Sequence, residues 1–273
     1  TDMVVSSDSG QQVIGKAPTT PERIFNGMGG ALESAAGELG VTPEQLLAEA
    51  TVLIYGTTRA TNAIVQGKVA KTAFLTTEGF PDTLVLKEGG KHGPHDFTQD
   101  YPDPYIPQKY TFEIPERIDS EGGVRKPLDD DAAYKILTRL KAHEFEAVAV
   151  CLMWSIMNPT HEQAIGRMIS EILPGVPYTL SHELVPIIRE YRRASATAID
   201  ASLKPLMQEH LRQMESDLRG AGYNGEILVS TAVGGCMHVE ELAQRPIHTV
   251  KSGPAMAPVA GLNYARIEDY GSD

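Results

Sequence analysis

The stretch Thr51–Asn62, TVLIYGTTRATN, decides the predicted fold. Its first five residues form an apolar, β-rich run, which predicts a buried strand over 51–55. Gly56-Thr57-Thr58 follows, and the next residues predict the first turns of a helix over 59–65. Backbone N–H groups and hydroxyls just before a helix N-terminus can bind an anion, because the helix dipole favours negative charge there. Threonine is also an ordinary helix cap, so both interpretations stay open here.

Outside this stretch, strands alternate with helices, which predicts an α/β domain with a mixed central sheet flanked by helices. The unbroken apolar run over 146–153 predicts a second central strand, buried on both faces. Further strands are expected at 3–6, 12–16, 69–76, 110–118, 178–181, 226–230 and 249–250. Helices are expected from 19 to Gly40, at 42–48, 129–143, 158–173, 184–219 with Pro205 as a kink or break, 239–243 and 255–266.

Residues 87–110 are rich in Gly, Pro and His, and a loop this long inside a domain is usually functional or mobile. His92-Gly-Pro-His95-Asp96 contains metal-ligand residue types, but Gly and Pro prevent a helical presentation, which favours a polar loop. The run Arg189–Arg193 is either a solvated helix face, a source of interdomain salt bridges, or a substrate-facing segment.

The composition excludes several classes of function. A net charge of −12 argues against nucleic acid or an anionic membrane as a partner. The two cysteines, Cys151 and Cys236, lie far apart and form no disulfide framework or zinc spacing, which predicts a reducing, cytoplasmic location. Cys151 is expected to be a buried core thiol. No apolar run reaches transmembrane length. The abrupt first and last residues lead us to expect a piece of a longer polypeptide.

Five blocks of sequence resemble, in order, those of the hydantoinase A/5-oxoprolinase family. They are Thr1-Asp2, like the end of a "GGTFTD" phosphate loop; the block over 54–63, like "HGTTxATNA"; and the blocks over 71–80, 189–195 and 252–255. This resemblance implies a ribonuclease-H-like fold of the actin, sugar kinase and heat-shock chaperone superfamily. It implies an N-terminal domain over 1–183, then a helical connection, strand and hinge helix over 184–273 that lead to a second ATPase domain.

The resemblance also implies chemistry. Such proteins use ATP and Mg²⁺ to phosphorylate an unreactive oxygen of a cyclic amide or imide, which a hydantoinase B-type partner then hydrolyses in a hetero-oligomer. Thr57 and Thr58 are then the candidate catalytic residues. Gly56 and Asn62 are further phosphate or substrate contacts. The remaining candidates for the nucleotide are Thr1, Asp2, Gly234 and Gly235, with Asp2 also holding Mg²⁺.

Departures from the family pattern leave the substrate open. Tyr55 stands in place of the usual His, Asp200 in place of Asn, and Thr231–Gly235 in place of "SNGG". An ATP-dependent ketone carboxylase is therefore an alternative, and a non-catalytic nucleotide-binding scaffold is another. With one domain and part of one phosphate loop, this chain alone is expected to bind ATP weakly, without hydrolysis. The helix over 255–266 is expected to lay Met256, Val259 and Leu262 against its own domain.

Overall fold

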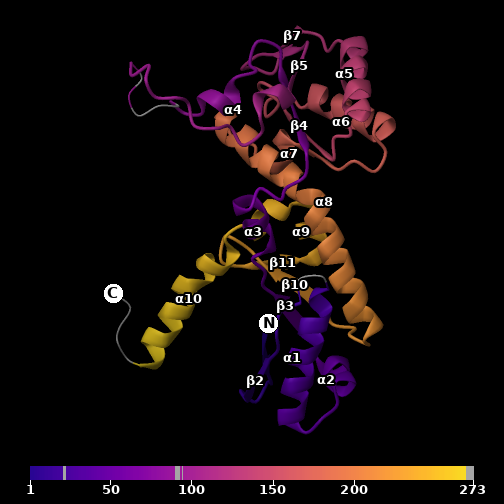
Figure 1. Ribbon diagram of the computed structural model, residues 1–273, viewed down its shortest axis with the longest axis vertical. Coiled ribbons are helices and arrows are strands. Elements are labelled where there is room, and N and C mark those ends of the chain that lie inside the picture. Colours follow the sequence, from indigo (N-terminus) through magenta and orange to yellow (C-terminus); the bar gives the residue numbers. More distant parts are fainter. Residues whose placement is uncertain (21–22, 90–92, 94, 269–273) are drawn as a thin grey trace. The chain divides into compact units, whose positions relative to one another are not determined.

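The computed structural model describes residues 1–20, 23–89, 93 and 95–268 (Figure 1). Strands and helices alternate, which confirms the α/β class. The chain forms two compact units: unit 1 is residues 1–58, 208–243 and 248–273, and unit 2 is residues 59–207 and 244–247. The described strands form separate sheets, of which the three-stranded sheet is mixed and the four-stranded sheet is parallel. The domain division at residue 183 stays a prediction.

Unit 2 is built on a four-stranded sheet. Its strands, in spatial order, are β5 (Thr111–Ile114), β4 (Thr72–Thr77), β8 (Ala147–Cys151) and β9 (Tyr178–Leu180). All neighbours are parallel. Every residue of β8 is buried, as is every residue of β4, because both faces of the sheet are covered. The prediction of a central, doubly buried strand at Ala147 is confirmed.

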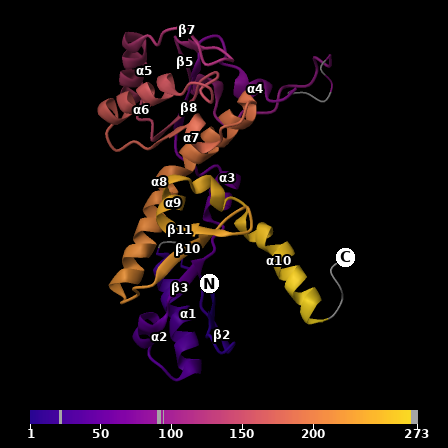
Figure 2. The ribbon, with the colours of Figure 1, turned by 180° about the vertical axis from the view of Figure 1, so that it is seen from behind.

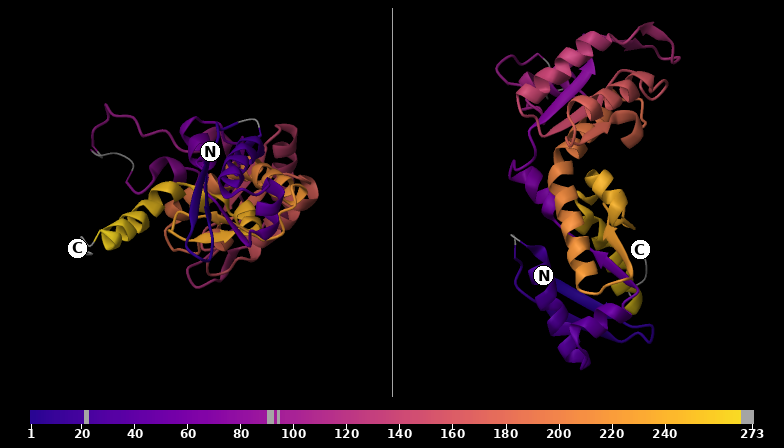
Figure 3. Two further views of the ribbon diagram at one scale, coloured as in Figure 1. Left: turned by 90° about the horizontal axis from the view of Figure 1, so that it is seen from below. Right: turned by 90° about the vertical axis from the view of Figure 1, so that its right-hand side faces the viewer.

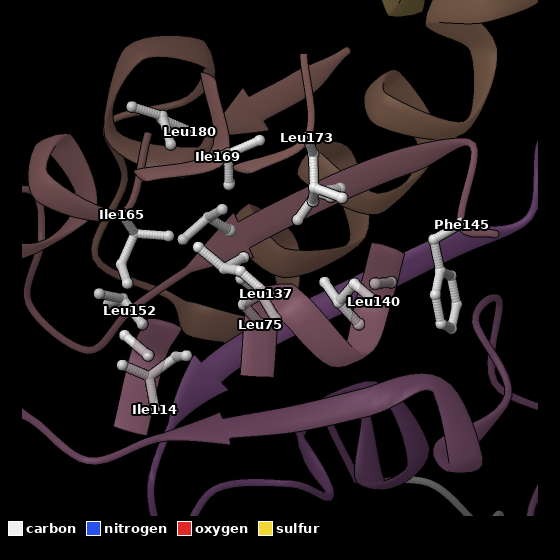
Figure 4. Packing of buried hydrophobic residues seen from close by; sticks show 14 residues of the cluster. Leu75, Ile114, Leu137, Leu140, Phe145, Leu152, Ile165, Ile169, Leu173 and Leu180 are labelled. Atoms are coloured by element: carbon white, nitrogen blue, oxygen red, sulfur yellow. The ribbon is translucent and has the colours of Figure 1, made fainter. Parts of the chain in front are cut away.

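Different kinds of residue cover the two faces of this sheet. On one face, α5 (Asp130–Ala142) and α6 (Thr160–Ile172) contribute large aliphatic side chains such as Leu137 and Ile165 (Figure 4). On the other face, small residues of β8 meet alanines of α8 (Glu190–Gly220). Ala and Val alternate along β8 for this reason: the alanines lie on the face packed closely against α8, and the valines lie on the face covered by large aliphatic side chains.

The remaining elements of unit 2 are short. They are α3 (Arg59–Val65), α4 (Thr83–Leu86), the 3₁₀ helix η1 (Gln108–Tyr110), β6 (Arg117–Ile118), β7 (Val124–Lys126) and α7 (Ser181–Leu184). The long helix expected from residue 184 starts only at Glu190, in α8, and Pro205 lies inside it without breaking it (Figure 3). An uninterrupted helix here means that packing outweighs the local cost of proline.

The first part of unit 1 is a hairpin on a helix. Strands β1 (Asp2–Ser6) and β2 (Gln12–Lys16) pair antiparallel and pack on α1 (Ile24–Leu39), which α2 (Pro43–Glu49) follows. A Cβ on Gly15 would lie 2.0 Å from the carbonyl oxygen of Ala31, so only glycine allows this close approach. Gly40 ends α1 as predicted, and its backbone has the left-handed conformation.

The second part of unit 1 is the sheet β11 (Cys236–His238), β10 (Glu226–Ser230) and β3 (Val52–Tyr55), in that order. β3 pairs parallel with β10 and lies at the edge of the sheet. Val52 is 48% exposed and Ile54 61%, so the prediction of a buried central strand at Thr51 is wrong. The apolar run has the composition of a buried strand, but alternate residues on one face have no cover within the described chain.

The end of unit 1 differs from the prediction in two places. The expected strand at Thr249 is wrong, because the 3₁₀ helix η2 (Pro246–Thr249) occupies it after α9 (Val239–Gln244). Within the described part of α10 (Ser252–Ile267), only Ser252 is buried, and Val259 and Leu262 are exposed. Figures 1 and 2 show α10 extending away from β10 and β11. The apolar side of α10 therefore does not pack on its own domain as expected. No described helix is both long and apolar enough to cross a membrane.

Candidate functional site

Two candidate loops leave the same edge of the unit 1 sheet. Tyr55 pairs with Val229 in the parallel β3–β10 ladder, so the two strands end together. Gly56–Thr58 follows β3 and Thr231–Gly235 follows β10. A Cβ built on Gly56 would lie 3.4 Å from the hydroxyl of Ser230, which shows that the loops are in contact at their bases. In open α/β sheets, ligands bind at such carboxyl ends of parallel strands.

The loop after β10 is a tight, glycine-dependent turn. The Gly234 N–H donates to the carbonyl of Thr231 at 3.2 Å, and the Thr231 N–H donates to that of Gly235 at 2.8 Å. Gly234 has φ of +82°, in the left-handed region where a side chain is strained. No atom lies within 4 Å of a Cβ built on Gly235, so its backbone is open to a ligand. The N–H groups of Thr231 and Gly234 are thus already paired, and the backbone at Gly235 is the part of this turn that a phosphate can approach.

The structure brings most of the predicted contacts together. Gly56 and Thr58 are exposed and Thr57 is half-buried, at the same sheet edge as Gly234 and Gly235. Asn62 is exposed on α3, which belongs to unit 2. The candidate residues on the two strand ends therefore form one cluster, whereas Asn62 belongs to the next element along the chain.

Thr1 and Asp2 lie on a different sheet, the β1–β2 hairpin. The Thr1 hydroxyl is 3.3 Å from that of Thr19. Asp2 forms an ion pair with Lys16 at 3.4 Å, and its side chain is 72% exposed. In the described residues no group of three or more His, Cys, Asp or Glu side chains could hold a metal ion. Asp2 thus fits Mg²⁺ only as a single carboxylate, with water and phosphate oxygens supplying the other ligands.

Tyr55 has a partner that the sequence does not reveal. Its hydroxyl lies 3.0 Å from Nε2 of His210, a nearly buried residue of α8 that is 155 positions away in the chain. The two rings are tilted, with centroids 5.9 Å apart. A contact between residues so distant in sequence leaves no local pattern to detect. The pair lies directly before Gly56 and fixes the end of β3.

The three arginines of the run 189–193 lie in two different environments. Arg189 and Arg192 are exposed and pair with the half-exposed Glu88. Arg193 is fully buried and donates to Ser181 Oγ at 3.0 Å, to the Leu152 carbonyl at 2.8 Å and to the Ile187 carbonyl at 2.9 Å. The prediction of a solvated surface is therefore confirmed for Arg189 and Arg192, whereas it is wrong for Arg193, which is buried.

A buried carboxylate completes the same network. Glu162 is fully buried and accepts hydrogen bonds from Ser181 Oγ at 2.6 Å and from the Leu152 N–H at 2.8 Å. It also pairs with Nδ1 of His182 at 2.6 Å. Both oxygens of the carboxylate therefore have hydrogen-bond partners, which offsets the cost of burying it. The sequence gives only a weak hint, since Glu162 reads as an ordinary acid in the first turn of α6.

Two other predicted features have a definite outcome. Cys151 is buried as expected, and burial raises the pKa of its thiol to about 11, which keeps it protonated and unreactive. His92 lies outside the described residues. The Thr98 hydroxyl and N–H both donate to Asp96 and hold the pKa of that carboxyl below its usual value. An Asp occupied in this way fits the polar-loop interpretation.

Comparisons with known proteins follow the resemblance seen in the sequence. Residues 1–173 match the model for the hydantoinase/oxoprolinase N-terminal region, and residues 193–272 match the hydantoinase/oxoprolinase model. The chain is 32% identical to the caprolactamase subunit alpha of Pseudomonas jessenii, over 97% of this chain and 38% of that protein. It is also 32% identical to the acetophenone carboxylase gamma subunit of Aromatoleum aromaticum, over 96% of this chain and 37% of that one.

Solved structures agree. The crystal structure of the ATP-dependent caprolactamase from Pseudomonas jessenii matches all of this chain with a TM-score of 0.88 and 31% identity, over 39% of that chain. Nucleotide-free acetone carboxylase matches 98% of this chain and 39% of its own, with a TM-score of 0.86 at 21% identity, which shows a shared fold. The chain thus spans less than two-fifths of the length of these relatives.

Proposed function

Because this chain belongs to the hydantoinase/oxoprolinase family, we propose that it is part of an ATP-dependent enzyme that activates a cyclic amide or imide for hydrolysis. The observation that carries the proposal is the meeting of Gly56–Thr58 and Thr231–Gly235 at one carboxyl edge of parallel strands. The likeness to a protein described as an ATP-dependent caprolactamase supports two parts of this proposal: ATP as the nucleotide and a lactam as the substrate.

The chemical need explains the residue types. An amide oxygen is a poor leaving group, and phosphorylation makes it a good one. When bound, ATP supplies the phosphoryl group, and Mg²⁺ neutralises charge on its oxygens. The hydroxyls of Thr57 and Thr58 and the backbone at Gly56 and Gly235 would then donate hydrogen bonds to phosphate oxygens, and Gly234 would hold the turn in shape for them. Asp2 would hold Mg²⁺ through water. Thr1 and Asn62 are the other residues that we propose as nucleotide contacts.

We further propose the finer features implied by the family. They are a ribonuclease-H-like fold, the domain division at residue 183, a hydantoinase B-type partner in a hetero-oligomer, and a reducing cytoplasmic location for the two free cysteines, Cys151 and Cys236. The fold proposal rests on the likeness to two solved structures. The partner proposal rests on relatives that are themselves subunits, named alpha and gamma.

A ketone carboxylase is the second candidate, and a specific observation favours it: the identity to the acetophenone carboxylase subunit equals that to the caprolactamase subunit. Bicarbonate dependence of ATP hydrolysis separates the two. A carboxylase needs bicarbonate for turnover, whereas an amide hydrolase turns over lactam without it. A non-catalytic scaffold, the third candidate, shows no substrate-dependent ATP hydrolysis with any partner.

The test is substitution of the two hydroxyls in the complete enzyme. We expect Thr57→Ala and Thr58→Ala each to lower ATP-dependent turnover on the order of 10²-fold, the usual cost of losing such a donor. Thr42→Ala is the matched control. The Thr42 hydroxyl caps α2 by accepting from the Gln45 N–H. Its loss should cost about 1 kcal/mol of stability and leave turnover unchanged. If Thr57→Ala and Thr58→Ala behave like Thr42→Ala, both threonines are helix caps.

A further inference from the structure

A hydrogen-bonded pair of side chains lies directly before the candidate nucleotide loop. The Tyr55 hydroxyl is 3.0 Å from Nε2 of His210, and Tyr55 is the last residue of β3, next to Gly56. The two rings are tilted by 46°, with their centroids 5.9 Å apart. Both residues belong to unit 1, so the contact forms within one compact unit. Any restraint on Tyr55 therefore acts on Gly56 through a single peptide bond.

His210 can hold Tyr55 in place because its own position on α8 is fixed by packing. His210 is 9% exposed, and its neighbours on the same helix, Leu211 and Met214, are 0% and 2% exposed. Side chains on a buried, closely packed surface have few conformations open to them. The hydrogen bond therefore ties the end of β3 to a part of α8 that cannot easily move.

The end of β3 needs such a restraint because β3 is an edge strand. Among the described strands it pairs only with β10, through the ladder that ends at Tyr55 and Val229. On that side, a Cβ built on Gly56 would lie 3.4 Å from the hydroxyl of Ser230, which is 8% exposed. On the other side no described strand supplies hydrogen bonds, and strand ends with few hydrogen bonds open readily. The His210 contact is thus a second attachment for the segment that enters the loop.

The contact also shows what the Tyr55 side chain does in this chain. Tyr55 stands where the family pattern has histidine, and a changed residue beside the loop is a natural candidate for substrate choice. The Tyr55 hydroxyl instead lies within hydrogen-bond distance of His210, on a helix that carries none of the candidate site residues. The change from His to Tyr therefore concerns how the loop is held rather than which group it presents to a substrate.

We propose that His210 is a positioning residue for the nucleotide: through the Tyr55 hydroxyl, it holds Gly56–Thr58 in the conformation that binds the phosphates of ATP. The inference rests on the proposed function, and it adds a support that lies outside the phosphate contacts. A loop that is already ordered loses less conformational entropy when a ligand binds. Removing the support should therefore weaken nucleotide binding without removing any group that touches the phosphates.

The experiment measures the dissociation constant of Mg-AMP-PNP, a nonhydrolysable ATP analogue, for the complete enzyme by calorimetry. Tyr55→Phe removes the hydroxyl and keeps the ring, and His210→Leu removes the imidazole. We expect each substitution to raise the dissociation constant about five- to tenfold, as the loss of one hydrogen bond does. The double variant Tyr55→Phe/His210→Leu should bind no more weakly than either single variant, because all three lack the same contact.

Tyr223→Phe is the matched control. The Tyr223 hydroxyl donates to the Glu226 carbonyl at 2.6 Å, at the start of β10 and so at the opposite end of the same sheet. Each of Tyr223→Phe and Tyr55→Phe removes one tyrosine hydrogen bond, so both should lower the melting temperature. Only Tyr55→Phe should raise the dissociation constant. A purely structural Tyr55 would instead behave like Tyr223, with a lower melting temperature and unchanged binding.

An exchange of the two residues tests the pair directly. Tyr55→His/His210→Tyr keeps a phenol and an imidazole on the same two elements in reversed order, and we expect it to bind the analogue within about threefold of the unchanged enzyme. The proposal is overturned if Tyr55→Phe binds as tightly as the unchanged enzyme, if the two single effects add in the double variant, or if the exchange variant binds no better than His210→Leu.

The outcome is separable from that of the proposed function. Thr57→Ala and Thr58→Ala remove the phosphate contacts themselves. An effect of those substitutions without one in Tyr55→Phe leaves the proposed function standing and removes only the positioning role. Absence of analogue binding by the unchanged enzyme would instead contradict the proposed function, and this inference with it.

Discussion

A single buried cation, Arg193, holds three segments of unit 2 together. Its guanidinium donates to Ser181, Leu152 and Ile187, which lie at the start of α7, just after β8 and just before α8. Ser181 in turn donates to the buried carboxylate of Glu162. The cation therefore stabilises the negative charge of Glu162 through one hydroxyl, at a place that water does not reach.

We expect Arg193→Met to lower the free energy of unfolding by roughly 3–5 kcal/mol, because it leaves a buried carboxylate without its compensating charge and two carbonyls without donors. Arg192→Met is the matched control. Arg192 pairs with Glu88 at the surface, so its loss should cost less than about 1 kcal/mol. Urea denaturation of both variants measures the difference. Equal losses would mean that the buried network contributes no more than a surface ion pair.

At the scale of elements, the sequence predicts the ends of helices and strands where neighbouring residues determine them. The start of α5 at Asp129 and the capped start of α2 are correct to within a residue, because side-chain caps are short-range chemistry. The ends of β3 and β10 are likewise correct, and with them the loops of the candidate site. Parallel pairing of these strands, which brings the loops together, follows from no local pattern.

The errors concern what packs on an element rather than the element itself. β3 and α10 both exist where predicted, but their apolar faces are exposed in the described chain. Apolar residues show which face prefers burial, not which segment covers it. Tyr55–His210 and Glu116–His161 were missed for the same reason, since each joins residues far apart in the sequence.

The cap of α5 gives a quantitative test at this scale. Asp129 accepts from the Ala132 N–H at 2.9 Å, so Asp129→Ala should destabilise the chain by about 1 kcal/mol. Asp131→Ala is the control, because Asp131 lies in the first turn of α5 and acts only through the helix dipole, worth roughly 0.3–1 kcal/mol. Thermal unfolding of the two variants compares them. A smaller effect at 129 than at 131 would contradict the capping role.

At the scale of the whole molecule, the two units differ in how their strands are covered. β4 and β8 of unit 2 are buried throughout, whereas β1, β2 and β3 of unit 1 have exposed residues on one face. Amide hydrogens of a strand that is buried on both faces exchange only when a large part of the unit opens. Those of a strand that is exposed on one face exchange when the strand opens locally. Hydrogen exchange should therefore be slowest in β4 and β8 and faster in β3.

The same measurement tests the candidate site. If Gly56–Thr58 and Thr231–Gly235 contact one phosphate group, adding Mg-ATP should slow exchange in both segments together, because opening of either segment becomes linked to ligand release. Helix α5, which is in unit 2 and caps itself, provides the internal control and should exchange at an unchanged rate. Protection of only one of the two loops would mean that only that loop contacts the phosphate, although both loops lie at the same sheet edge. Equal protection throughout the chain would instead report general stabilisation, and the assignment of the phosphates to this edge would then be wrong.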